Sequence, residues 1–133
     1  MIGLFNKSVT VLNREPLADG SDKYYPTFIN NVCLQIHNTS NNNVTNSNVS
    51  SKCLLIVKKL MLPKPYLNPK EWCSANNKSN NITFKTDDYI VAGAINESNI
   101  TDISAINDKY DYVFKINSVA YFQLTDSFQI KTL

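Results

Sequence analysis

The stretch from Ile82 to Tyr121 constrains the fold of this chain most, because it predicts two strands joined by a short helix. The helix is expected over Thr101 to Tyr110, where apolar residues recur at spacings of three and four. These apolar residues are Ile100, Ile103, Ile106 and Tyr110. Asn99 or Thr101 is available as the N-cap, with Asp102 in the first turn. We therefore expect a short helix with one apolar face.

Other segments alternate apolar and polar residues, as strands with one face in water do. The expected strands are Ser8 to Leu12, Tyr24 to His37, Lys52 to Leu60, Ile82 to Phe84, Tyr89 to Ile95, Tyr112 to Tyr121, and a last strand around Phe128 and Ile130. In the second strand, Phe28, Val32, Leu34 and Ile36 are expected on one face, and Pro26 interrupts the pattern. The sequence predicts one mainly β domain over residues 1–133, a small barrel or sandwich of about six strands with one short α-helix and long polar loops.

Three connections are expected between these strands. Asn38 to Ser51 consists almost entirely of Asn, Ser, Thr and Val and predicts a long flexible loop, which makes the flanking strands an extended hairpin. Prolines make Leu62 to Lys70 an irregular connection, with Tyr66 and Trp72 as its expected anchors. Asn76 to Asn81 predicts a second polar loop, and Gly93 is expected to end or bulge a strand.

Composition indicates an ordinary globular protein. A formal charge of +2 and a hydrophobic share of 43% do not indicate a dedicated nucleic-acid binder or a disordered chain. The longest apolar run, Leu54 to Val57, is far shorter than the roughly 20 residues that span a bilayer. The first residues lack the pattern of a secretory signal, and the number of cysteines is odd, so we expect the chain to be made and to remain in a reducing cytoplasm.

The residues that carry chemistry elsewhere do not form a recognisable site in this sequence. The single histidine, His37, lies beside the Asn-rich loop, and Cys33, Cys53 and Cys73 lack the close spacing of zinc ligands. The carboxylates of Asp87, Asp88, Asp102, Asp108 and Asp111 fall at turns and helix ends, where we expect them to cap backbone donors and stay solvated. Lys58, Lys59 and Lys64 form a small basic cluster that permits at most weak DNA contact. The sequence predicts no catalytic residue, cofactor or metal, and we expect a protein that is not an enzyme.

Several short motifs occur along the chain in a characteristic order. At the start they are Val9-Thr10-Val11-Leu12-Asn13 and Tyr24-Tyr25-Pro26-Thr27 leading into Ile29-Asn30-Asn31-Val32. Later come Tyr66 to Trp72, Asp88-Tyr89-Ile90-Val91-Ala92-Gly93, Lys109-Tyr110-Asp111-Tyr112-Val113 and Ile116-Asn117-Ser118-Val119. These motifs resemble those of one family of tailed bacteriophages, the small minor capsid proteins encoded among the head–tail joining genes. The chain departs from the family pattern at Asp87, where a glycine is usual, and at Ser127-Phe128, where a His-Trp pair is usual.

This resemblance implies a structural protein of the virion neck, a small barrel that assembles as a ring and joins the DNA-filled head to the tail. Its partners would be further copies of itself, the portal or adaptor on one side and tail-terminator or tail proteins on the other, with nonspecific DNA contact inside the lumen and no membrane. A stopper or head-closure role is favoured, and a mobile loop would narrow the lumen until ejection. A tail terminator or other neck protein, and a non-catalytic β binding module with polar recognition loops, are the alternatives.

The Asn-rich loop is the main candidate for contacts with other subunits, the lumen or the tail, because it is longer than most connections in a compact domain. The connection from Pro63 to Asn81 is the second candidate. The expected contact residues are Asn41, Asn42, Asn43, Val44, Asn46, Asn48, Tyr66 and Trp72.

Overall fold

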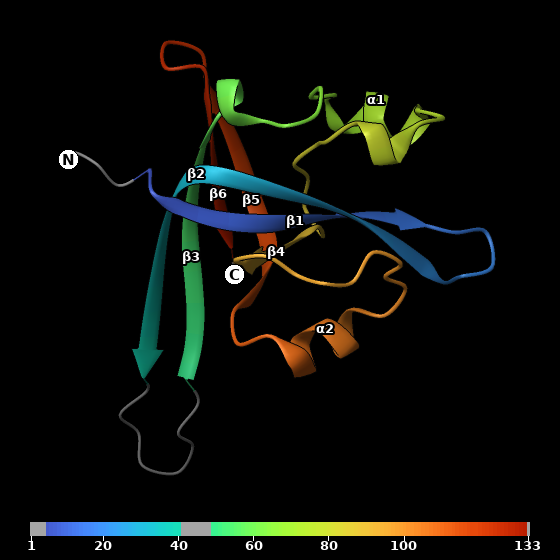
Figure 1. Ribbon diagram of the computed structural model, residues 1–133, viewed down its shortest axis with the longest axis horizontal. Helices are drawn as coiled ribbons and strands as arrows, with labels where there is room; N and C mark the ends of the chain where they lie inside the picture. Colours follow the sequence, from blue (N-terminus) through green and yellow to red (C-terminus); the bar gives the residue numbers. More distant parts are fainter. Residues whose placement is uncertain (1–4, 41–48, 133) are drawn as a thin grey trace.

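The structure is a computed structural model that describes residues 5–40 and 49–132. Antiparallel strands close into a barrel in the order β1-β2-β3-β6-β5-β4 (Figure 1). The strands are β1 (Lys7–Pro16), β2 (Asp22–Ser40), β3 (Val49–Lys58), β4 (Tyr89–Ala92), β5 (Val113–Phe122) and β6 (Ser127–Thr132). The mainly β barrel predicted from the sequence is confirmed, and β2 and β3 form the expected extended hairpin.

A β-bulge at Asn31 changes which side chains of β2 face the interior. Lys7 of β1 pairs with Val32, whereas the next residue, Ser8, pairs with Asn30, so Asn31 is an extra residue with φ of 59°. Before the bulge Ile29 is buried and Phe28 is 42% exposed, and after it Val32 is buried. The prediction that Phe28 shares an inner face with Val32 is wrong, because one inserted residue reverses the alternation along the strand.

The barrel interior is filled by the inward row of each strand. Val9 and Val11 of β1 meet Leu55 and Val57 of β3, and Ile130 of β6 joins them, all with no exposed surface. The other buried members are Ile29, Val32, Cys53, Ile82, Phe84, Ile90, Phe114, Ile116 and Phe128. Branched residues suit this role because they pack well on a pleated surface.

The segment Ile82–Phe84 was predicted as a strand, and this prediction is wrong. Its backbone is extended, but it makes only an isolated parallel bridge between Ile82 and Tyr66 within the described residues. Ile82 and Phe84 nevertheless lie fully inside the barrel core, where the Phe84 ring is 4.9 Å from that of Phe128. The apolar pattern therefore predicts the burial of this segment correctly. Whether the segment joins the sheet depends on which backbone lies beside it.

Helix α2 (Ile103–Lys109) packs on the outside of the barrel. Its Ile106 and the preceding Ile100 cover Leu12 and Val91, which point outward from β1 and β4, and Tyr24 completes this second core. The predicted apolar stripe is confirmed. The N-cap is Asp102, whose carboxylate accepts a hydrogen bond from the backbone N–H of Ser104 at 3.0 Å, so Asn99 and Thr101 were the wrong choices.

A second helix, α1 (Pro69–Ser74), lies in the connection that was predicted to be irregular. Asn68 caps it by accepting from the Glu71 backbone N–H at 2.9 Å, and Pro69 occupies the first helical position. Asn followed by Pro and, two positions later, Glu is a helix-start pattern, so the signal was present in the sequence. Two short 3₁₀ turns, η1 (Lys59–Met61) and η2 (Lys78–Asn80), complete the connection between β3 and β4.

The chain turns at both ends of β4, at residues with a positive φ. Asp87, with φ of 74°, turns the chain into β4, and Gly93, with φ of 86°, ends it as predicted. The strand is shorter than the expected Tyr89 to Ile95, because after Gly93 the chain leaves β1 and runs toward α2.

Candidate functional site

The hairpin of β2 and β3 continues beyond the barrel as a two-stranded ribbon, which we call the β2–β3 ribbon (residues 37–40 and 49–52). Pairing of β1 with β2 runs from Pro16 to Lys7, opposite Val32, and β6 joins β3 from Leu54 onward. Beyond these points, the ladder continues from His37 opposite Lys52 to Ser40 opposite Val49. Figure 1 shows this end of the hairpin projecting away from the rest of the molecule. The predicted loop from Asn38 to Ser51 is therefore strand at both ends.

The predicted contact residues divide into two groups. Asn41, Asn42, Asn43, Val44, Asn46 and Asn48 lie outside the described residues, so their part of the prediction stays a prediction. Tyr66 and Trp72 are placed in the protein itself. Trp72 has no exposed surface, and the Tyr66 ring lies 4.6 Å from that of Phe128 in the core. Both are anchors, as expected, but the Trp72 side chain is completely buried within the chain and cannot contact a partner, so we no longer propose it as a contact residue.

Trp72 fastens the long connection to the outer end of the β1–β2 hairpin. Its ring meets that of Tyr25 edge to face at 5.7 Å, and the ammonium groups of Lys85 and Lys78 lie 5.0 and 5.7 Å from it. Tyr25 donates a hydrogen bond to Glu15 at 2.7 Å, and burial together with this bond raises the pKa of Tyr25 to about 12. Such aromatic and cation–π contacts make this region a rigid support for the barrel.

Asp88 lies in a buried polar network, which corrects the expectation that it is a solvated turn residue. Its carboxylate has no exposed surface and accepts hydrogen bonds from Asn13 Nδ2 at 2.8 Å and from the Arg14 backbone N–H at 2.9 Å. Lys85 forms an ion pair with the same carboxylate and donates to the Arg14 carbonyl at 2.7 Å. Burial raises the pKa of Asp88, opposed by Lys85 and by these donors. The network ties the chain just before β4 to β1.

The remaining candidate chemical groups are separate in the structure. His37 is exposed on the β2–β3 ribbon, Cys33 and Cys53 are buried free thiols, and Cys73 is an exposed free thiol. Burial raises the pKa of Cys53 to about 11, so its sulfur behaves as a small apolar group. Across residues 5–40 and 49–132, no group of three or more His, Cys, Asp or Glu is arranged to hold a metal ion.

The three lysines of the predicted basic cluster, Lys58, Lys59 and Lys64, also do not form one site. Lys64 is half-buried and donates hydrogen bonds to Thr27 Oγ1 at 3.0 Å and to the Pro26 carbonyl at 3.3 Å. Lys58 and Lys59 are exposed, with the Lys58 ammonium 4.5 Å from the centre of the Phe5 ring. Lys64 therefore has a structural role on β2, and Lys58 belongs to a different surface.

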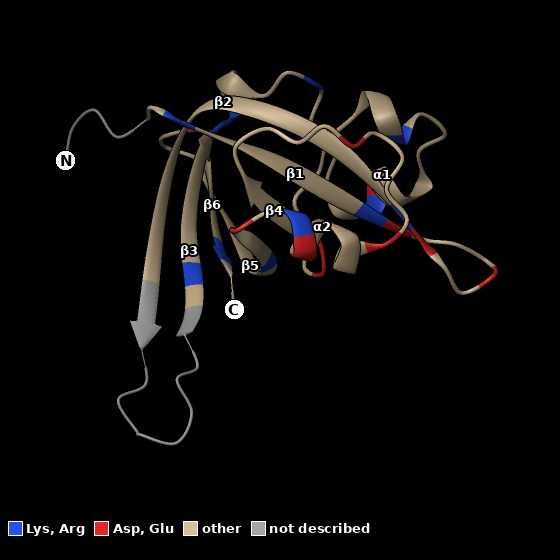
Figure 2. Ribbon diagram, turned by 60° about the horizontal axis from the view of Figure 1, so that its bottom comes forward, with Lys and Arg blue, Asp and Glu red and all other residues tan. Residues whose placement is uncertain are grey.

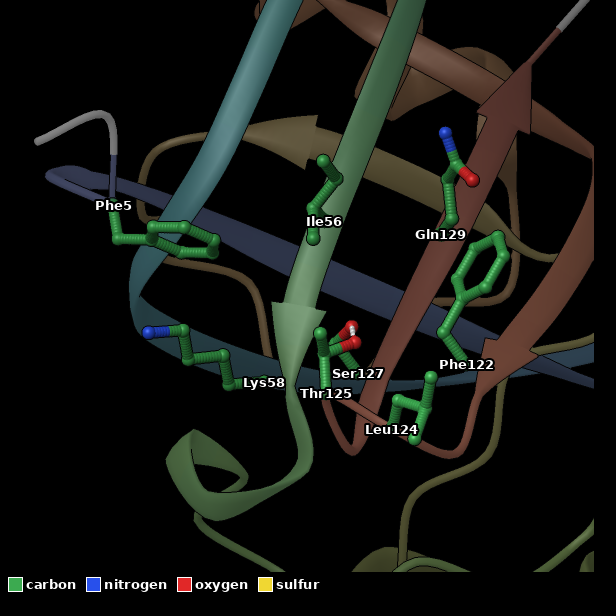
Figure 3. Close-up of a pocket in the computed structure, with 8 residues that line it drawn as sticks. All are labelled: Phe5, Ile56, Lys58, Phe122, Leu124, Thr125, Ser127 and Gln129. Carbon is green, nitrogen blue, oxygen red and sulfur yellow. Dashed lines mark hydrogen bonds between the residues drawn. The ribbon is translucent and has the colours of Figure 1, made fainter. Parts of the chain in front are cut away.

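That surface is an apolar groove on the outside of β3 and β6, which we call the β3–β6 groove (Figure 3). It has a volume of about 510 Å³ and is lined by Phe5, Ile56, Lys58, Phe122, Leu124, Thr125, Ser127 and Gln129. Phe122 is 47% exposed and Leu124, in the turn between β5 and β6, is completely exposed. The groove was missed from the sequence, because Leu54, Ile56 and Val57 read as one buried strand without a distinction between inner and outer faces.

A family model of unknown function, DUF6751, matches residues 4–130, and the chain belongs to this family. No curated protein matches the chain. No solved structure matches it either. Within the described part of the chain, no helix is long and apolar enough to cross a membrane.

Proposed function

We propose that this protein is a structural component of a phage virion, a head-closure or stopper connector that forms a ring between the portal or adaptor and the tail. The observation that carries the proposal is a closed barrel from which the end of one hairpin, the β2–β3 ribbon, projects. Closure of the barrel pairs the strand edges within it, which limits uncontrolled strand pairing there. In a ring, such a ribbon from each subunit would reach toward the lumen or a neighbour.

In the proposed ring, the β2–β3 ribbon would be supported by its neighbours. A two-stranded hairpin on its own is at best marginally stable in water. Contact with other subunits or with the wall of a channel would add to the stability of the ribbon. Its tip lies in the Asn-rich stretch, whose uncharged polar residues suit a surface that meets DNA or water without binding either tightly.

The motifs that resemble the phage family support a shared fold, because they lie at positions that shape the barrel. Asp88 ties β4 to β1 through Asn13 and the Arg14 backbone, and Gly93 turns the chain away from β1 with a positive φ. Phe114 and Ile116, in the last motif region, fill the interior. The resemblance thus concerns the scaffold, and the function of the ring would lie in the surfaces that the scaffold carries.

The first experiment asks where the protein is found. Purified virions of the phage that carries this gene would be dissociated and analysed by mass spectrometry and by antibody labelling in electron micrographs. We expect a few copies per particle, located at the neck. Absence of the protein from mature virions would refute the proposal.

The second experiment tests the ribbon. Residues 41–48, which lie outside the described residues, are replaced by Asn-Gly, a two-residue turn that joins paired strand ends such as Ser40 and Val49. We expect particles that package DNA but fail to retain it, measured as encapsidated genome per head. The matched control carries Asn-Gly in place of Asp19-Gly20 in the β1–β2 turn and should retain DNA normally. Normal DNA retention by the ribbon variant would refute the gating role.

A further inference from the structure

The β3–β6 groove lies on a basic face of the barrel. Outward side chains of β3 alternate with the buried row and read Lys52, Leu54, Ile56 and Lys58, and Lys131 of β6 is exposed beside them. Within the described residues of β3 and β6 there is no acidic side chain. This face therefore combines an apolar groove with lysines on β3 and β6, which Figure 2 shows in blue. The β5–β6 turn beside the groove adds one exposed carboxylate, Asp126, which accepts a hydrogen bond from the Tyr121 hydroxyl.

An acidic surface lies on α2 and the residues around it. Residues 97–111 hold four acidic side chains, at Glu97, Asp102, Asp108 and Asp111, and one lysine, Lys109. Lys109 is paired with Glu97 at 3.0 Å, which leaves the net charge of the exposed helix face negative. Ala105 and Asp108 are exposed on the helix, and Tyr112 just after it is 40% exposed. We call this the α2 face.

The two faces point in opposite directions. In the barrel order β1-β2-β3-β6-β5-β4, β6 is opposite β1 and β3 is opposite β4. Helix α2 covers the outside of β1 and β4, whereas the groove is on the outside of β3 and β6. Complementary surfaces on opposite sides of one subunit allow head-to-tail contact, which closes into a ring when the rotation between neighbours permits it.

We infer that the β3–β6 groove of one copy receives the α2 face of the next copy, with Phe122 and Leu124 packed around Ala105 and Tyr112 and with Lys58 and Lys131 near Asp108 and Asp111. The occupant is a second copy of this chain, because the charges of the two faces are opposite and both are present on every subunit. The inference rests on the proposed ring and names the contact that would hold it together. It also explains why large apolar side chains stay exposed on an otherwise closed barrel.

Two variants of the full chain test the contact. The groove variant carries Phe122→Asp and Leu124→Asp, which place negative charge where the acidic α2 face would dock. The helix variant carries Asp108→Lys and Asp111→Lys, which place positive charge against the basic groove. Both sets of positions are exposed, and a lysine near the C-terminus of α2 is favourable to the helix dipole, so both variants should fold. Leu17→Asp, an exposed leucine in the β1–β2 turn, is the matched control.

Self-association is measured by sedimentation velocity over a concentration series. Wild type and the control should associate, and each variant alone should stay monomeric, with a dissociation constant raised by more than about tenfold. An equimolar mixture of the two variants should associate, because the intact groove of the helix variant can bind the intact α2 face of the groove variant. Raised salt should weaken the wild-type contact, since the faces are charged.

Three outcomes would overturn the inference: a wild-type chain that stays monomeric at its solubility limit, a variant that associates as wild type does, or a mixture that does not associate. A two-fold contact between like surfaces would show itself because one of the two variants, the one whose self-pairing surface is intact, would then associate on its own. The proposed function fails separately, through absence from the virion neck. A neck protein whose variants still assemble would refute this contact and leave the proposed function intact.

Discussion

The two outer faces of the barrel differ in how they are covered. On the β1–β4 face, Leu12 and Val91 point outward and are completely buried beneath Ile100 and Ile106. On the β3–β6 face, Phe122 and Leu124 also point outward and stay exposed. Both faces carry apolar side chains, but among the described residues a helix covers the β1–β4 face alone. The first face is thus completed by the chain itself, and the second is the face for which we propose contact with another copy.

The largest expected effect comes from placing the same charged residue, aspartate, on each of the two faces. Ile106→Asp places a carboxylate between α2 and the barrel, where it has no partner, and should lower the free energy of unfolding by about 4 kcal/mol. Phe122→Asp on the bare face, where the side chain is 47% exposed, should lower it by only about 1 kcal/mol. Urea unfolding followed by circular dichroism measures both. Similar losses for the two variants would show that the β3–β6 face is part of the subunit's own core.

A second comparison concerns the connection that leads into the covered face. Asp88→Asn removes the charge that pairs with Lys85 in the buried network and should lower the free energy of unfolding by about 2 kcal/mol. This loss is smaller than for a fully enclosed ion pair, because Lys85 keeps some access to water. Its neighbour provides the control. Asp87 is exposed with φ of 74°, a conformation that asparagine adopts readily, so Asp87→Asn should leave the unfolding midpoint unchanged. Equal midpoints for the two variants would contradict the role assigned to Asp88.

A smaller effect is expected at the start of α2. Asp102→Ala removes the N-cap that accepts from the Ser104 N–H and should lower Tm by a few degrees. Asp108→Ala on the same helix removes an exposed carboxylate without a capping role and serves as the control. Differential scanning calorimetry distinguishes them. A Tm for Asp102→Ala that equals that of the control would mean that the cap adds nothing to the apolar packing that holds α2 on the barrel.

The smallest effect is a pH dependence on the covered side. Glu97 accepts from the Tyr110 hydroxyl at 2.7 Å and pairs with Lys109, and these partners lower the pKa of Glu97 from its ordinary 4.5 to about 2. Because the folded-state pKa is the lower one, the stabilisation is present above pH 4.5 and is lost as the pH falls toward 2. Glu97→Gln should therefore flatten the fall of Tm between these pH values. An unchanged acid profile would refute this role for Glu97.

Local sequence patterns predicted most of the secondary structure. Each of the six strands was expected, β4 with a later end than it has, as was the apolar face of α2, because the spacing of apolar residues reflects the geometry of a single element. The errors have local and non-local causes. Helix α1 was overlooked although its cap is visible at Asn68 and Pro69, whereas the bulge at Asn31 appears only when β1 is paired with β2.

The candidate surfaces were harder to predict from the sequence than the secondary structure was. The hairpin was expected from the polar stretch between two strands, but its continuation as a ribbon depends on where β1 and β6 stop pairing. The β3–β6 groove required the position of Phe5 and of the β5–β6 turn beside Ile56, residues far apart in the chain. Trp72 was expected to anchor the connection, and only its complete burial removed it from the list of contact residues.

The sequence by itself determined which segments extend, where α2 forms and that a core of branched and aromatic residues exists, because these depend on neighbouring residues along the chain. Tertiary structure decided that Asp88 is buried with Lys85, that Ile82 and Phe84 enter the core without joining the sheet, and that one outer face stays bare. The physical reason is that burial depends on what lies across the barrel, and closure brings together strands that are distant in sequence.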